Sequence, residues 1–157
     1  MTTLEMELAV VSYLNPRQNL IIPNVWWGIS LHECDLLILT KNNYAYEVEI
    51  KISKSDLVAD REKKHQHFNN KIKKLYFAIP EILLGYKQYI PDTAGIIVVS
   101  ENGFCEKIRE ARVKNSYRWT DEEKYNAARL GTMRIWGLKE KIRKLLEVNN
   151  KCRDSKS

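Results

Sequence analysis

The spacing of hydrophobic positions changes several times along the chain, and each change marks the boundary of an expected element. Apolar residues recur every three or four positions over residues 3–14, which predicts a helix that ends before Pro16. Residues 19–27 favour a strand. Pro23 inside it indicates an edge or bulged strand, because proline has no N–H to donate to a sheet ladder.

Two apolar segments follow, over residues 33–40 and 44–52, and a short polar turn joins them into a predicted hairpin. The first segment is apolar on both faces, which indicates a central strand. The second alternates strictly, so one face carries apolar side chains and the other carries charged ones. The apolar set is Val48, Ile50 and Ile52, and the charged set is Glu47, Glu49 and Lys51.

The remaining residues continue the alternation of helices and strands, and this order predicts an α/β fold in which helices flank a mixed sheet. We interpret residues 1–150 as a single domain, with a core at about 3–108, a helical extension over 120–150 and a polar tail over 151–157. The expected elements are a helix capped by Ser55, strands over residues 73–80, 94–100 and 104–108, a short helix over 81–86, and a C-terminal helix that starts at a Thr120–Glu123 capping box and divides around Gly131 or Gly137.

Composition adds weaker constraints. The 157 residues include 44% hydrophobic and 29% charged residues, which is typical of a globular protein, and a net charge of +6 favours a polyanionic partner. No apolar run is long enough to cross a bilayer, and the first residues lack the basic segment of a signal peptide. Three cysteines without CxxC spacing favour reduced thiols. We therefore expect a cytoplasmic protein with no membrane partner.

The charged residues of the hairpin carry the candidate chemistry. Asp35 lies near the start of the first hairpin strand, and Glu49 and Lys51 project from one side of the second. Carboxylates on adjacent strands provide the hard oxygen ligands that Mg²⁺ or Mn²⁺ prefers, and an ammonium beside them can stabilise extra charge on a phosphate. This combination is typical of a metal-dependent nuclease.

The alternative interpretation is that these residues decorate the solvated face of an antiparallel hairpin, where alternating charges are normal. The sequence that follows the hairpin favours the nuclease. Residues 51–74 contain eight Lys or Arg against three Asp or Glu, an excess that could neutralise phosphates.

Longer strings in the same region resemble a known group of enzymes. Asp35 followed by Glu49-Ile-Lys51 resembles the PD-(D/E)XK nuclease superfamily, whose core has the order αβββαβ. The string Tyr46-Glu-Val-Glu-Ile-Lys-Ile-Ser-Lys-Ser-Asp-Leu-Val-Ala-Asp-Arg61 is similar to the MmcB-like branch of that superfamily, which is associated with DNA repair and also occurs in phages and mobile elements. Lys73-Lys-Leu-Tyr-Phe-Ala-Ile-Pro80 and Gly95-Ile-Ile-Val-Val99 extend the likeness, which covers residues 30–108.

The resemblance implies a restriction-endonuclease-like fold and a set of site residues. Asp35 and Glu49 would bind Mg²⁺ or Mn²⁺, and Lys51 would be the catalytic lysine. A glutamate of the first helix often joins such a site, and here Glu5 and Glu7 are both candidates, with Glu5 favoured by spacing. Cys34 stands where the superfamily usually has proline. Lys64 is a further candidate for catalysis, and the expected DNA contacts are Lys54, Arg61, Lys63, Lys64 and Lys71.

The sequence therefore predicts a magnesium- or manganese-dependent deoxyribonuclease that hydrolyses phosphodiester bonds in DNA repair or in the processing of phage or mobile-element DNA. We expect DNA as the partner and a homodimer as a candidate assembly. A nuclease-fold module without activity, which binds DNA or another protein, is the alternative. An RNA-directed nuclease is a third hypothesis, which no RNA-specific motif supports.

Overall fold

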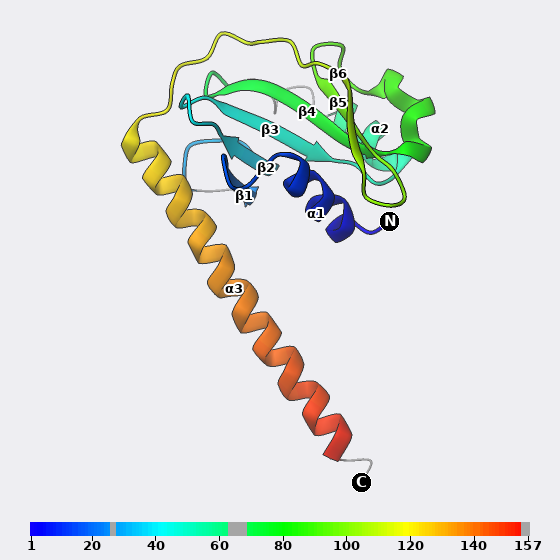
Figure 1. The fold of residues 1–157 in the computed structure, drawn as a ribbon, viewed down its shortest axis with the longest axis vertical. Helices are drawn as coiled ribbons and strands as arrows, with labels where there is room; N and C mark the ends of the chain where they lie inside the picture. The colour runs from blue at the N-terminus through cyan, green and yellow to red at the C-terminus, as the bar shows by residue number, and fades with distance from the viewer. Residues whose placement is uncertain (26–27, 63–68, 155–157) are drawn as a thin grey trace.

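The computed structural model of the chain describes residues 1–25, 28–62 and 69–154. Within these residues, six strands form one sheet whose spatial order follows the sequence, and three α-helices and a 3-10 helix surround it (Figure 1). The strands are β1 (Leu20–Val25), β2 (Cys34–Leu39), β3 (Ala45–Ile50), β4 (Ile72–Pro80), β5 (Gly95–Val99) and β6 (Cys105–Arg109). The helices are α1 (Thr3–Tyr13), α2 (Lys54–Glu62), η1 (Glu81–Tyr89) and α3 (Asp121–Asp154).

The sheet is mixed. Hairpins join β1 to β2, β2 to β3 and β5 to β6 in antiparallel pairs, whereas β3, β4 and β5 run parallel to one another. Each parallel step needs a connection that returns along the sheet. α2 lies in the first of these connections and η1 in the second. The predicted α/β class, the element order and the mixed sheet are confirmed.

The face of the sheet that α1 covers, here called the α1 face, has one continuous hydrophobic cluster. Met6 and Val10 are the fully buried side chains of α1, and they pack onto Leu36 of β2 and Val48 of β3. The cluster continues across β4 and β5 to Cys105 of β6. It therefore spans the sheet from β2 to β6.

The opposite face has two separate clusters. One lies over β1 and β2 and includes Trp119 and the first turns of α3, while the other lies over β4 and β5 and includes Leu57 of α2 and Leu83 of η1. β3 runs between these clusters, and the side chains that it turns to this face after Ala45 are charged. They are Glu47, Glu49 and Lys51, and together with Asp60 of α2 they are here called the charged strip.

Most boundaries lie within one or two residues of the prediction, and Pro23 lies on an edge strand as expected. The cap of α2 was predicted wrongly: Ser53, not Ser55, accepts the N–H of Asp56, at 3.2 Å. η1 extends to Tyr89, beyond the predicted end. Cys34 and Cys105 are free buried thiols, in agreement with the expectation for these two residues.

The prediction that the C-terminal helix divides at Gly131 or Gly137 is wrong, because α3 is one helix of 34 residues. A glycine inside a helix costs about 1 kcal/mol relative to alanine, which is too little to interrupt so long an element. The helix begins at the predicted capping box, in which Thr120 and Glu123 exchange hydrogen bonds of 2.9 and 3.2 Å.

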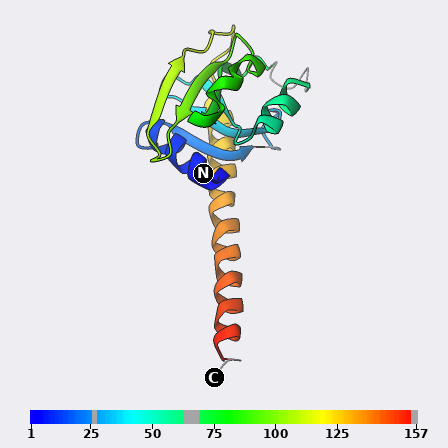
Figure 2. The same ribbon diagram turned by 90° about the vertical axis from the view of Figure 1, so that its right-hand side faces the viewer.

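Among the described side chains of α3, those of the first turns contact the domain. Ala127 and Leu130 are buried against the β1–β2 cluster, and Arg134 donates to the backbone carbonyl of Asn24 at 2.8 Å. Beyond this point the helix projects away from the sheet, as two perpendicular views show (Figures 1 and 2). Within the described residues, no helix combines the length and the apolar character that crossing a membrane requires.

Candidate active site

The backbone register brings the three predicted site residues together. β2 and β3 are antiparallel, and the pairing of Leu36 with Val48 places Asp35 opposite Glu49. The Asp35 carboxylate accepts the backbone N–H of Ile50 at 2.7 Å, so it lies directly against β3. Lys51 follows one residue later and donates its backbone N–H to Ala78 of β4 at 3.0 Å. The site therefore lies where β3 ends, between β2 and β4.

Lys51 is held by two carboxylates. Its Nζ lies 2.8 Å from Oε2 of Glu49 and 2.8 Å from Oδ1 of Asp60, which comes from α2. The sequence prediction did not assign Asp60 to the site. A signal was present, because Asp60 lies three residues after the buried Leu57 and so shares the helix side that faces the sheet.

These charged side chains are buried. Glu49 is 6% exposed, Lys51 8% and Asp60 6%. Both faces of the hairpin are covered, so the interpretation of a solvated hairpin face does not apply. Burial of charged groups is unfavourable unless they are paired, which explains why Lys51 sits between two acids.

Burial and mutual repulsion perturb the carboxylates. Burial, followed by the negative charge of Asp35, raises the pKa of Glu49 to about 7, against the opposing effect of Lys51. Burial also raises the pKa of Asp35, although the Ile50 N–H and Lys51 counteract it. Burial alone would lower the pKa of Lys51, but the Glu49 charge and the hydrogen bonds to Asp60 and Glu49 raise it instead. Lys51 therefore keeps its positive charge, and a second cation would stabilise the ionised forms of the acids.

The donor set fits a hard divalent cation. Oε1 of Glu49 is buried and has no hydrogen-bond partner among the described residues, while Oε2 is taken by Lys51. Asp35 opposite it supplies a second carboxylate. Mg²⁺ needs only one or two protein carboxylates because it keeps several waters. In the described part of the chain, no group of three or more His, Cys, Asp or Glu could form a fuller cage.

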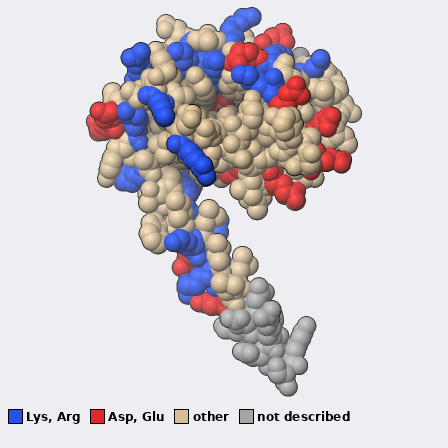
Figure 3. Space-filling view, in the orientation of Figure 1, with Lys and Arg blue, Asp and Glu red and all other residues tan. Residues whose placement is uncertain are grey.

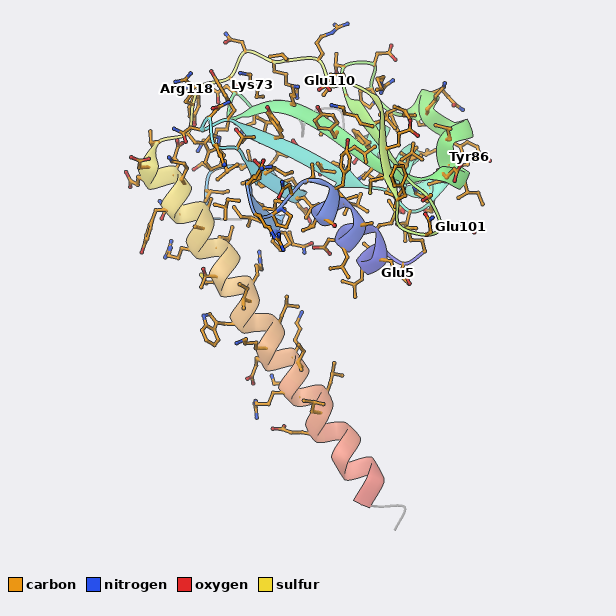
Figure 4. All side chains as sticks on the ribbon, viewed as in Figure 1. Glu5, Lys73, Tyr86, Glu101, Glu110 and Arg118 are labelled. Carbon is orange, nitrogen blue, oxygen red and sulfur yellow. The ribbon has the colours of Figure 1, made fainter. Side chains whose placement is uncertain are left out.

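The two candidate glutamates of α1 have different environments. Glu5 is exposed and belongs to the capping box of α1, where its carboxylate accepts the Thr2 N–H at 2.6 Å. Figure 4 shows Glu5 beside the turn that carries Glu101. Glu7 instead lines a depression with Leu36, and burial, then the charge of Asp35, raises its pKa. Of these two glutamates, Glu7 is therefore the one that interacts electrostatically with Asp35.

The structure describes two of the predicted DNA contacts, and they differ in exposure. The Lys54 ammonium lies on the exposed start of α2, 4.9 Å from the centre of the Tyr86 ring. Lys71 is half-buried, because its Nζ donates to the Ile29 carbonyl at 3.0 Å and pairs with Glu123 at 3.2 Å. Lys71 therefore has a structural partner on α3. Lys63 and Lys64 lie outside the described residues, and so does the side chain of Arg61.

A second polar pair continues the charged strip along β3. Glu47 is fully buried, and its Oε1 lies 2.9 Å from Nε2 of His32. The loop before β2 thus folds over the charged side of β3 at Glu47. Sequence reasoning placed Glu47 on the correct face but did not connect it with His32, because a contact across fifteen residues depends on the path of the loop.

Basic and aromatic side chains gather at the other end of β3. The Lys73 ammonium lies 3.2 Å from the centre of the Tyr44 ring, and the Arg118 guanidinium lies 5.5 Å from it. Lys73 and Arg118 stand together in Figure 4, at the end of the domain where α3 begins. Lys and Arg predominate over this end in Figure 3, whereas Asp and Glu predominate at the lower right.

Comparison with known proteins supports the fold alone. No protein-family model matches the chain, and no curated protein matches it. Among solved structures, the chain is similar to the SPO1766 protein of unknown function from Silicibacter pomeroyi, with 14% sequence identity and a TM-score of 0.63. The likeness covers 88% of each chain. The arrangement of helices and strands is therefore shared with another protein over most of both chains.

Proposed function

We propose that this protein is a metal-dependent nuclease of the restriction-endonuclease-like class that hydrolyses phosphodiester bonds in DNA. The observation that carries the proposal is the buried oxygen Oε1 of Glu49, which has no hydrogen-bond partner among the described residues and belongs to a carboxylate opposite Asp35. A buried carboxylate oxygen of this kind is costly without a donor or a cation. A Mg²⁺ or Mn²⁺ ion held by Asp35 and Glu49 would satisfy it.

The topology supports the same class. The order from α1 to β4 is αβββαβ, with an antiparallel β2–β3 hairpin and a parallel β3–β4 pair joined through α2. The resemblance of the Asp35 and Glu49-Ile-Lys51 motif to PD-(D/E)XK nucleases falls on this part of the sheet. The basic character of the chain and its net charge of +6 are consistent with DNA as the partner.

Each side chain would have a distinct role. The bound cation would polarise the phosphate and provide an activated water. Lys51 would lie beside the reacting phosphate and offset the charge that develops on it. Asp60 is a positioning residue, because its contact with Nζ fixes where the Lys51 ammonium lies. The Asp60 carboxylate would stay paired with the Lys51 ammonium and would not contact the phosphate.

Two isosteric variants test the proposal. Asp35→Asn and Glu49→Gln should each remove Mg²⁺ or Mn²⁺ binding in isothermal titration and abolish cleavage of labelled DNA, while the fold stays intact by circular dichroism. Single-stranded, duplex and branched DNA and RNA, each with metal and with chelator, would define the substrate. Glu106→Gln, on an exposed position of β6, is the matched control and should behave as wild type. Metal-dependent cleavage that survives in Glu49→Gln would contradict the mechanism.

One observation favours a second function. Lys51 already pairs with both Glu49 and Asp60, so the site can persist as an ion-pair network without a metal. A nuclease-fold module that binds DNA or a protein without cleaving it would have such a network. It would bind DNA equally in metal and in chelator, and titration with Mg²⁺ or Mn²⁺ would give no saturable heat.

A further inference from the structure

The part of α3 that projects beyond the domain carries large apolar side chains on its surface. Five of them are aliphatic, expose between 55% and 64% of their area and lie within about three turns of the helix. They are Ile135, Leu138, Ile142, Leu145 and Leu146. Contiguous apolar surface of this extent on a water-exposed helix marks an interaction site.

Four of the five form a single seam. Ile135, Leu138, Ile142 and Leu145 are separated by three, four and three residues, which is the spacing of the a and d positions of a coiled coil. This spacing reads the same in both directions along the helix. A seam of this kind is complementary to a second identical seam that runs the opposite way.

We propose that the seam is covered by a second copy of this chain, with the two α3 helices packed antiparallel. Ile135 would then face the partner's Leu145, and Leu138 would face the partner's Ile142. Each of these layers occurs twice, because the two-fold axis passes between them and makes the interface isologous. The proposal is independent of the nuclease assignment.

The exposed area supports a second copy as the occupant. Five side chains exposed by more than half contribute on the order of 500 Å² per chain, and two copies together reach about 1,000 Å², the lower bound for a specific interface. The flanking Lys139 and Lys141 add their aliphatic stems to this area. No additional protein is needed to bury the seam.

The globular domain decides the direction of the pairing. Gly131 occupies the next d position toward the domain, and there the helix lies against Ile22: a Cβ added at Gly131 would be 3.6 Å from the Ile22 side chain. A parallel partner in register would need to occupy the same space. An antiparallel partner centred between Leu138 and Ile142 places the two globular domains at opposite ends of the helix pair, and the two helices can follow the seam up to about residue 145, because the next position toward the domain, Gly131, lies against Ile22.

The charges beside the seam distinguish a second copy of the chain from other occupants. Lys139 and Lys141 flank the seam, and near the two-fold axis each would face its own copy. The repulsion is screened by salt, so self-association should tighten as ionic strength rises. Binding of an acidic segment or of nucleic acid to the same helix would instead weaken as ionic strength rises.

Sedimentation equilibrium of the full chain tests the pairing. We expect a reversible dimer, and Leu138→Glu should raise its dissociation constant at least about 100-fold, because one buried leucine is lost from each copy. Met133→Glu is the matched control, since Met133 is 47% exposed but lies on the side of the helix away from the seam, and it should leave the dimer unchanged. Circular dichroism should show that both variants keep the folded domain. A monomer at all concentrations, or a dimer unaffected by Leu138→Glu, would overturn the proposal.

Disulfide trapping tests the direction. In a Cys152→Ser background, chains carrying Leu138→Cys are mixed with chains carrying Ile142→Cys under mild oxidation. Antiparallel packing predicts that the mixed disulfide forms faster than either symmetric one, because residues 138 and 142 face each other. Preferred 138–138 and 142–142 disulfides would show parallel packing and overturn the assignment.

Discussion

The middle of the sheet is packed differently on its two faces. On the α1 face, residues of β2, β3, β4 and β5 join one hydrophobic cluster with Met6 and Val10. On the opposite face, the β1–β2 and β4–β5 clusters are separated by the charged strip on β3. The side chains of the charged strip are buried, so exposure to solvent does not explain the difference.

The comparison separates stability from function. Replacing a buried ion-pair network by apolar residues of similar volume is often neutral or stabilising by about 1–4 kcal/mol. The α1 face shows that apolar residues of this chain can fill the middle of the sheet. Filling the middle of the sheet therefore does not require the charged strip, and perturbed groups of this kind cluster at functional sites.

The largest effect should come from Lys51→Ala. The variant leaves Glu49 and Asp60 buried without their cation, and we expect it to lose about 3–5 kcal/mol of unfolding free energy at neutral pH in chelator. Cleavage by the fraction that remains folded should fall by about 1,000-fold or more. Urea unfolding and single-turnover cleavage measure the two effects. The exposed neighbour Lys54→Ala is the control, and a cleavage rate in Lys51→Ala equal to wild type would remove Lys51 from the mechanism.

The α1 face should respond in stability alone. Leu36→Ala removes a fully buried side chain from the continuous cluster and should cost about 2–5 kcal/mol. Metal affinity and cleavage per folded molecule should stay near wild type, measured well below the unfolding midpoint. A loss of cleavage in the folded fraction would show that the two faces are not separable.

The charged strip should make stability depend on pH. The pKa of Glu49 is raised from 4.5 to about 7 by folding, so the folded state holds its proton more tightly and stability is lost as pH rises through about 7. Glu49→Gln mimics the protonated acid and should remove this loss. In chelator, the unfolding free energy of Glu49→Gln should exceed that of wild type by on the order of 2–3 kcal/mol above pH 7, and by little near pH 4.5. Urea unfolding at a series of pH values measures the difference, and parallel curves would contradict the assignment.

The smallest effects distinguish the two glutamates of α1. Glu5→Gln should lower the melting temperature slightly through the weakened capping box and leave metal affinity unchanged. Glu7→Gln should shift the pH dependence of metal binding, because Glu7 and Asp35 interact electrostatically. Titration calorimetry at several pH values compares them. A change in metal affinity for Glu5→Gln but not Glu7→Gln would restore the preference that spacing suggested.

Much of the fold was predictable because its signals are local. Helical periods, alternation, short apolar runs and turn signals located the strands and helices, and Pro23 and the Thr120–Glu123 box marked an edge and a helix start. The undivided α3 was missed because a glycine signal was given more weight than its cost of about 1 kcal/mol justifies.

The sequence by itself determined that Glu49 and Lys51 share one side of a strand, because the alternation of side chains is a property of the backbone. Only the tertiary structure decided that this side is buried, that Asp35 lies opposite Glu49, and that Asp60 and His32 join the charged strip. Register, helix docking and loop path depend on the packing of distant segments. Packing of distant segments also decides that Glu5 caps α1 while Glu7 interacts with Asp35, and that the seam of α3 stays exposed.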